Sequence, residues 1–97
     1  NILKTNIGSD IAPPGLARII LNKYKFYLSN GKYLNNIQEL IDELSIIDND
    51  TFKFHVNQHK NDFSNWIYDI IKDKTLAKQI RNVFNPDDMI SIIKKRI

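Results

Sequence analysis

The sequence predicts a mainly α fold, with four to five short helices around a small core and a short N-terminal β-hairpin. Apolar residues recur at helical spacing through most of residues 36–97, and an Asn or Asp stands where each helix would begin. The pair Asn30-Gly31 separates two short runs rich in aromatic residues, which is typical of a hairpin turn. The 97 residues fit one domain, and a hydrophobic share of 42% is enough for a small core.

Residues 1–15 are expected to form an extended arm, followed by a single mostly helical domain over residues 16–97. The triplet Pro13-Pro14-Gly15 cannot lie inside a helix. A solvated tail needs no large apolar residues, yet this arm carries Ile2, Leu3, Ile7 and Ile11. We therefore predict that the apolar side chains of the arm pack on the domain itself or bind a partner.

Residues 16–28 fit both a helix and a strand, because their apolar residues can share one face of either. Aromatic and β-branched residues favour a strand near the end of this stretch. We predict a hairpin of residues 25–28 and 32–34, with a type I′ turn at Asn30-Gly31, since Asn and Gly accept positive φ angles. Two strands alone are only marginally stable, so the hairpin should lie on the helices.

Five helices are expected after the hairpin. The expected starts are Asn35 or Asn36, Asp48-Asn49-Asp50, Asn61 or Asp62, Asp73, and Asn85-Pro86. The last helix has acidic residues in its first turn and basic residues in its last, the order that the helix dipole favours. The predicted core consists of Leu40, Ile41, Leu44, Phe52, Val56, Phe63, Trp66, Ile67, Ile70, Leu76, Ile80, Val83 and Phe84.

Composition excludes several classes of function. The chain has no cysteine, which excludes disulfides, cysteine-ligated zinc and thiol catalysis, and favours an intracellular location in the cytoplasm or inside a larger assembly such as a virion. It has three glycines and no glycine-rich phosphate loop, and no nucleophile stands in a catalytic pattern. We expect no catalytic residue, no cofactor, no small-molecule substrate and no membrane span, so the protein is predicted not to be an enzyme.

Charge is segregated along the chain. Residues 1–34 carry five Lys or Arg against one Asp, and residues 74–97 carry six against two Asp. Residues 35–73 carry eight Asp or Glu against three Lys. This layout suits compensation within one domain, docking on a complementary protein surface, or binding to nucleic acid.

Residues 52–67 form the densest stretch, with the only Trp and both His. On one continuous helix His55 and His59 would share a face, as in helical zinc sites. No Glu lies between them and a third ligand would have to be Asp62 or a distant carboxylate, so we expect no metal. The simpler interpretation makes His55 a packing residue hydrogen-bonded to backbone and leaves His59 exposed.

The same stretch admits a second interpretation. Asn61 or Asp62 can cap a helix while Trp66 fills the core. Alternatively, a surface patch binds a protein partner, with hydrogen-bonding groups beside an aromatic anchor. The residues of that patch are His59, Asn61, Asn65 and Trp66.

Basic residues cluster in the C-terminal third and could form one positive face. They are Lys74, Lys78, Arg81, Lys94, Lys95 and Arg96. Such a face would bind phosphates without sequence preference. Tyr24, Tyr27 and Tyr33, close in sequence to Lys23, Lys25 and Lys32, also resemble a strand surface on which single-stranded bases stack, although they could equally pack on helices.

A longer pattern runs through residues 26–81. Its residues are Phe26, Asn30-Gly31, Leu40, Leu44, Phe52, Phe54-His55-Val56, Lys60-Asn61-Asp62-Phe63, Trp66-Ile67, Asp73 and Leu76-Ala77. This pattern resembles a family of small prokaryotic, notably archaeal, domains of unknown function. The resemblance supports a domain boundary, and it does not point to any activity or ligand.

Two functions are therefore predicted. The first is a non-catalytic protein-interaction or assembly module, a structural protein that docks on copies of itself or on a partner through the arm and the segregated charge. The alternative is a small basic nucleic-acid-binding or chromatin-like protein. Salt separates them, because phosphate-driven binding weakens steeply with salt whereas apolar burial does not.

Overall fold

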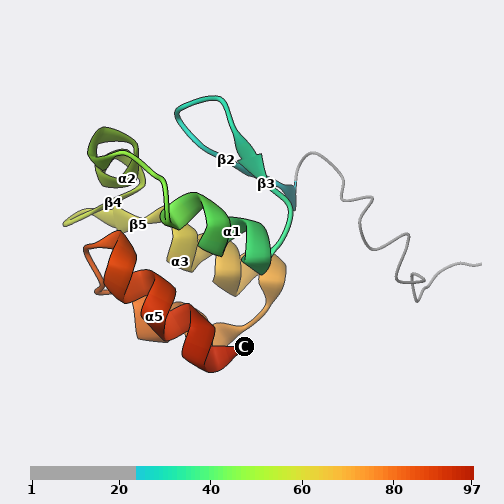
Figure 1. The fold of residues 1–97 in the computed structure, drawn as a ribbon. Coiled ribbons are helices and arrows are strands. Elements are labelled where there is room, and N and C mark those ends of the chain that lie inside the picture. Colours follow the sequence, from blue (N-terminus) through green and yellow to red (C-terminus); the bar gives the residue numbers. More distant parts are fainter. Residues whose placement is uncertain (1–23) are drawn as a thin grey trace, which may run out of the picture.

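The computed structural model describes residues 24–97, so the predicted arm with Ile2, Leu3, Ile7 and Ile11 lies outside the described residues. The described part is mainly helical with two small antiparallel sheets, which confirms the predicted fold class (Figure 1). Its elements are β2 (Phe26–Tyr27), β3 (Tyr33–Leu34), α1 (Ile37–Leu44), α2 (Asn49–His55), β4 (Val56–Asn57), β5 (Lys60–Asn61), α3 (Asp62–Trp66), η4 (Ile67–Ile71), α4 (Lys74–Ile80) and α5 (Pro86–Arg96).

The predicted hairpin is present, but its turn is of another type. Strands β2 and β3 pair antiparallel with Phe26 opposite Leu34. Leu28 N–H donates to Lys32 O, Gly31 N–H donates to Leu28 O, and Gly31 has a φ of 89°. A type I′ turn also needs positive φ at Asn30, and among the described residues Lys72 is the only non-glycine with positive φ. The loop is therefore a three-residue turn closed by a glycine bulge.

The five α-helices begin as the sequence predicts. Each has an Asn or Asp at its N-cap whose side-chain oxygen accepts a hydrogen bond from the backbone N–H three residues later, at 2.7–3.0 Å. The caps are Asn36, Asp48, Asn61, Asp73 and Asn85. Each cap satisfies a backbone donor that the helix cannot satisfy itself, so the starts depend only on local sequence.

The second and third helices differ from the expected pattern. Helix α2 ends at His55, and the next residues form the β4–β5 hairpin with Val56 opposite Asn61. The two histidines therefore do not lie on one continuous helix. Helix α3 passes into the π-helical turn η4, where Lys72 N–H donates to Ile67 O. The wider turn changes the helical register, and Ile70 is only half-buried.

The core lies where the helices cross. Helix α5 packs against α1 on one side and α4 on the other, and α4 also packs against α3 and η4 (Figure 1). Ten of the thirteen predicted core residues are buried, while Ile70 and Val83 are half-buried and Phe84 is wrongly placed in the prediction, being 57% exposed. The core also contains Phe26, Leu28, Leu34, Met89 and Ile93. Within residues 24–97, every helix is too short or too polar to cross a bilayer.

Candidate functional site

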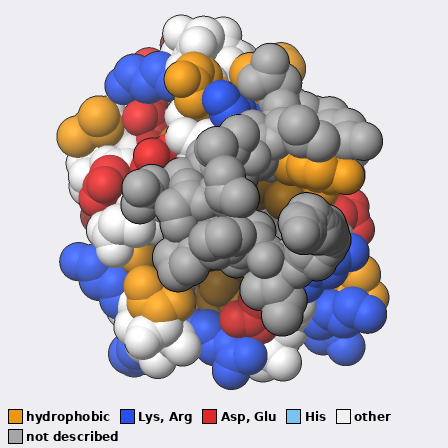
Figure 2. Space-filling view, turned by 90° about the vertical axis from the view of Figure 1, so that its right-hand side faces the viewer, with side chains coloured by type: hydrophobic (Ala, Val, Ile, Leu, Met, Phe, Trp, Pro, Cys, Tyr) orange, Lys and Arg blue, Asp and Glu red, His pale blue; other side chains and the backbone are white. Residues whose placement is uncertain are grey.

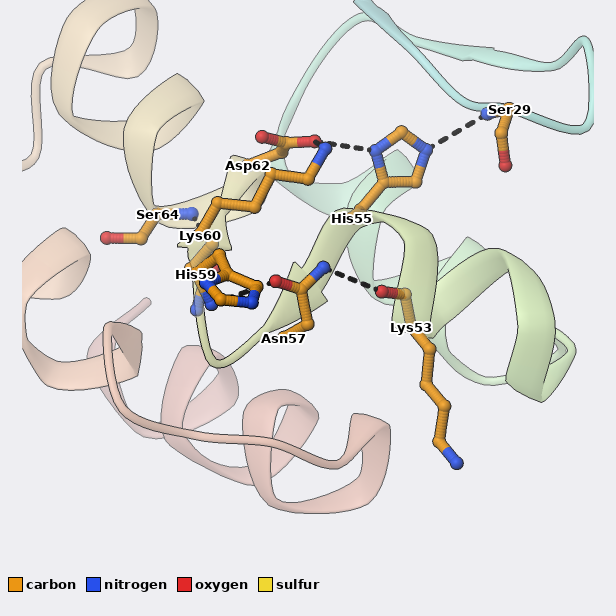
Figure 3. A network of polar contacts seen from close by, with 9 residues as sticks. Ser29, Lys53, His55, Asn57, His59, Lys60, Asp62 and Ser64 are labelled. Atoms are coloured by element: carbon orange, nitrogen blue, oxygen red, sulfur yellow. Dashed lines mark hydrogen bonds and ion pairs between the residues drawn. The ribbon is translucent and has the colours of Figure 1, made fainter.

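His55 is the most strongly constrained polar residue of the dense stretch. Its side chain is 5% exposed and lies between two partners, with Nδ1 at 2.9 Å from an Asp62 oxygen and Nε2 at 2.9 Å from Ser29 N (Figure 3). Because the Ser29 amide can only donate, Nε2 accepts, and Nδ1 carries the hydrogen that is donated to Asp62. His55 thus ties the first hairpin to the start of α3.

The turn between β4 and β5 is held by Asn57. Its Oδ1 accepts a hydrogen bond from His59 N–H at 2.9 Å, and its Nδ2 donates to Lys53 O at 3.0 Å (Figure 3). These two bonds hold the start of the turn and tie it to helix α2, and the His59 side chain is exposed. Among residues 24–97, no group of three His, Asp or Glu residues could hold a metal ion.

A polar groove lies between this turn, helix α3 and the α4–α5 loop. We call it the amide groove, because five of its ten lining residues are Asn or Gln. Its volume is about 310 Å³, near the lower end of ordinary ligand pockets. The residues that line it are Asn57, Gln58, His59, Lys60, Asn61, Ser64, Asn65, Arg81, Asn82 and Phe84.

Two buried side chains hold the walls of the amide groove together. Asn61, the N-cap of α3, also donates from Nδ2 to Ile80 O at 2.9 Å and to Arg81 O at 3.3 Å. Ser64 Oγ donates to Ala77 O at 2.7 Å. These bonds join the start of α3 to α4 and place the end of α4, with Arg81, beside the β4–β5 turn. The buried hydrogen bonds of Asn61 and Ser64 therefore fix the position of the groove walls.

The groove leaves several hydrogen-bonding groups unused. Within the described part of the chain, the side chains of Asn65, Arg81 and Asn82 make no hydrogen bond or ion pair, and all three are exposed. No Asp or Glu is among the described lining residues, whereas Arg81 and Lys60 are. Lys60 Nζ is already paired with Asp62 at 2.9 Å. Arg81 is therefore the free cation of the described groove wall.

The predicted partner-binding patch is only partly brought together. His59, Asn61 and Asn65 all line the amide groove, but Asn61 is 7% exposed and its side chain is occupied by structural bonds. Trp66 is not a surface anchor, since it is also 7% exposed, packs edge-on against Phe26 and donates from Nε1 to Tyr24 O. The aromatic residue at the groove is instead Phe84, which the helical spacing had assigned to the core.

The six basic residues do not form a uniform face. Arg96 donates to both carboxylate oxygens of Asp73 at 2.9 Å. These hydrogen bonds, and after them the hydrogen bond from the Leu76 N–H, lower the pKa of Asp73. The same pairing raises the pKa of Arg96. Lys74 lies 5.3 Å from the Tyr68 ring centre, and Arg81 belongs to the amide groove. The remaining three, Lys78, Lys94 and Lys95, are exposed. On the face in Figure 2, Lys and Arg side chains are interspersed with acidic and hydrophobic ones.

The first hairpin presents a second aromatic surface. Tyr27 and Tyr33 are opposite each other across the strands, 53% and 50% exposed, with ring centres 6.1 Å apart. Lys25 Nζ lies 4.2 Å from the Tyr33 ring centre. Lys32 is instead directed to Glu43, at 3.3 Å. The exposed hairpin face therefore combines two rings with one cation.

Comparison with models of protein families, with curated proteins and with solved structures finds no match to this chain.

Proposed function

We propose that this chain is a non-catalytic protein-interaction module that binds a polypeptide segment in the amide groove. One observation carries the proposal: Asn65, Arg81 and Asn82 are uncommitted and surround a hollow beside Phe84, which is 57% exposed. The other polar groups at this end of the molecule, His55 and Asn61 above all, are occupied by bonds that hold the fold together. Exposed aromatic residues beside free polar groups are typical of binding surfaces.

The groove chemistry suits a peptide. Side-chain amides can donate to backbone carbonyls and accept from backbone N–H groups, and they do so without a change of charge. The Arg81 guanidinium can take a carboxylate in a two-pronged contact. Phe84 offers an apolar surface for one side chain of the bound segment. These features favour a short segment with mixed polar and apolar residues.

The remaining parts of the proposal rest on the sequence. The N-terminal arm would add a second, apolar attachment and make the chain an assembly module. The family resemblance of residues 26–81 and the intracellular location stay predictions. If the arm drives assembly, deletion of residues 1–12 abolishes oligomers in light scattering; an unchanged oligomer would remove the arm from the proposal.

The groove itself is tested by selection of peptides from a random displayed library on the full chain. Peptides that depend on the groove should lose binding when Phe84→Ala and Asn65→Ala are combined. The matched control is Tyr27→Ala, because Tyr27 is 53% exposed and does not line the groove. If all selected peptides bind the groove variant and the wild type equally, the groove is not the binding site.

Nucleic-acid binding remains the alternative, favoured by the exposed Tyr27–Tyr33 pair with Lys25 beside it. Stacking of a base on such a ring is worth roughly 1–3 kcal/mol. Under this alternative, a labelled oligothymidylate binds at low salt, weakens steeply as salt rises, and loses affinity in Tyr27→Ala and Tyr33→Ala. Binding that is insensitive to both substitutions would exclude this surface.

A further inference from the structure

Resting on the proposed function, we infer that the amide groove takes a specific surface of a second copy of this chain. That surface is the turn between α1 and α2, which we call the acidic knob and define as Asp42, Ile46, Asp48 and Asp50. The inferred contact places the Ile46 side chain against Phe84 of the other copy and the knob carboxylates near its Arg81. We propose a head-to-tail contact, with one knob in one groove for each pair of copies; knob and groove share no residue.

The acidic knob offers exposed apolar and acidic side chains, and its Asp42 and Ile46 also line a hollow beside the first hairpin. Ile46 is 68% exposed, the most exposed of the large hydrophobic side chains in residues 24–97. It comes four residues after Asp42, which lies in α1, and precedes Asp48 and Asp50, and all three Asp residues are exposed. The Thr51 N–H lowers the pKa of Asp48, so this carboxylate keeps its negative charge below its usual pH range. The knob thus combines one exposed apolar side chain with three exposed carboxylates.

The amide groove has the complementary properties. Its aromatic residue is exposed, its free cation is Arg81, and no Asp or Glu is among its described lining residues. Opposite charge steers two surfaces together and excludes like-charged pairings, while an apolar contact at the centre supplies most of the affinity. Exposed Ile and exposed Phe are each costly alone, and the proposed contact buries both.

The geometry has a consequence for assembly. A head-to-tail contact leaves one free knob and one free groove on every dimer, so it continues into rings or chains. A hollow of about 310 Å³ seats a turn but not a broad face, so the contact belongs to the weak, transient class of interfaces. Association should therefore grow with concentration and pass the dimer without a fixed end point.

Two exposed substitutions remove one half of the contact each. Ile46→Ser removes the apolar side chain of the knob and leaves the groove intact, and Arg81→Glu destroys the groove and leaves the knob intact. Matched controls are Ile97→Ser, since Ile97 is 67% exposed, and Lys78→Glu, which makes the same charge change one turn earlier on α4 outside the groove. Circular dichroism checks that all four variants fold, and the full chain is used throughout.

Sedimentation at increasing concentration should show wild type and both controls associating beyond the dimer. Each of the two test variants should associate at least tenfold more weakly on its own. Mixed in equal amounts, they should form a dimer that grows no further, because the mixture retains a single working pairing of knob and groove. Recovery on mixing shows that the knob of one copy binds the groove of the other, and growth of the wild type past the dimer distinguishes a head-to-tail contact from a reciprocal two-fold one.

Four results would overturn the inference: a wild type that stays monomeric, a wild type that stops at the dimer, association that survives both substitutions, or a mixture that does not pair. A monomeric wild type that still binds groove-dependent peptides from the library would remove self-docking while the proposed function stands. Failure of both experiments would remove the groove as a binding site altogether.

Discussion

Replacement of His55 tests how much of the stability depends on one buried imidazole. His55→Phe keeps an aromatic ring beside Phe26 and Phe63, whose centres lie 5.1 and 5.7 Å away, but loses the hydrogen bonds to Ser29 and Asp62. The Ser29 amide can turn to water, since Ser29 is exposed. Asp62 is 28% exposed and keeps Lys60. Each lost bond therefore costs about 1 kcal/mol, so we expect a loss of about 2 kcal/mol.

His55→Ala removes the ring as well. Deletion of a buried aromatic ring from a core costs about 3–5 kcal/mol, and imidazole is the smallest such ring, so with the two lost bonds we expect a total loss of about 5 kcal/mol. Against a total stability of about 5–15 kcal/mol for a domain of this size, the alanine variant is close to unfolding. The phenylalanine variant should melt about 10 °C below wild type.

Urea unfolding followed by the fluorescence of Trp66 measures both variants, because Trp66 is the only tryptophan and is 7% exposed in the folded chain. The control is His59, which is exposed, and whose Phe and Ala variants should stay within about 0.5 kcal/mol of wild type. A His55→Phe variant as stable as wild type would refute the role assigned to the two hydrogen bonds.

Three further predictions concern residues outside the histidine network. Asn61→Ala removes a helix cap and the hydrogen bonds to Ile80 O and Arg81 O, so urea unfolding should show a free energy of unfolding about 2–3 kcal/mol lower. The control is Asn36→Ala, which removes an exposed cap and should lower the free energy of unfolding by about 1 kcal/mol. Gly31→Ala meets no atom within 4 Å but must adopt a φ of 89°, so thermal melting should show a loss of about 1–2 kcal/mol, and no loss would mean that the turn rearranges. The pKa of Asp73 is lowered from 3.8 by the folded contacts, so its contribution is present above that value and is lost as pH falls through the folded pKa. The stability difference between wild type and Asp73→Asn should therefore be full at neutral pH and shrink in acid, and a difference that persists at the lowest pH would contradict this assignment.

Some features of the protein follow from its sequence alone because the interactions behind them are local. The helix starts at Asn36, Asp48, Asn61, Asp73 and Asn85 each depend on a side chain and an N–H three residues away. The position of the first hairpin follows from a glycine that accepts positive φ. The mainly α class needs nothing beyond these starts and the apolar spacing between them.

Tertiary contacts decided what local patterns leave open. The apolar spacing after Asp73 places Phe84 on the core face, but helix α4 ends at Ile80 and the chain turns at Asn85, so the Phe84 side chain comes to lie at the groove. His55 finds its partner Ser29 26 residues earlier in the chain. The spacing of apolar residues along the sequence does not predict a hydrogen bond between residues so far apart in the chain.

The candidate site shows the same division. His59, Asn61 and Asn65 could be selected from the sequence because they are polar and close together, and the fold does gather them at one groove. Arg81, Asn82 and Phe84 join them only because Asn61 bonds to the end of α4 across some twenty residues of chain. Trp66 points the other way, since a large apolar ring beside Phe26 is more stable buried than exposed. The sequence thus determined which residues begin each helix, whereas long-range packing and buried hydrogen bonds determined which side chains remain free to bind.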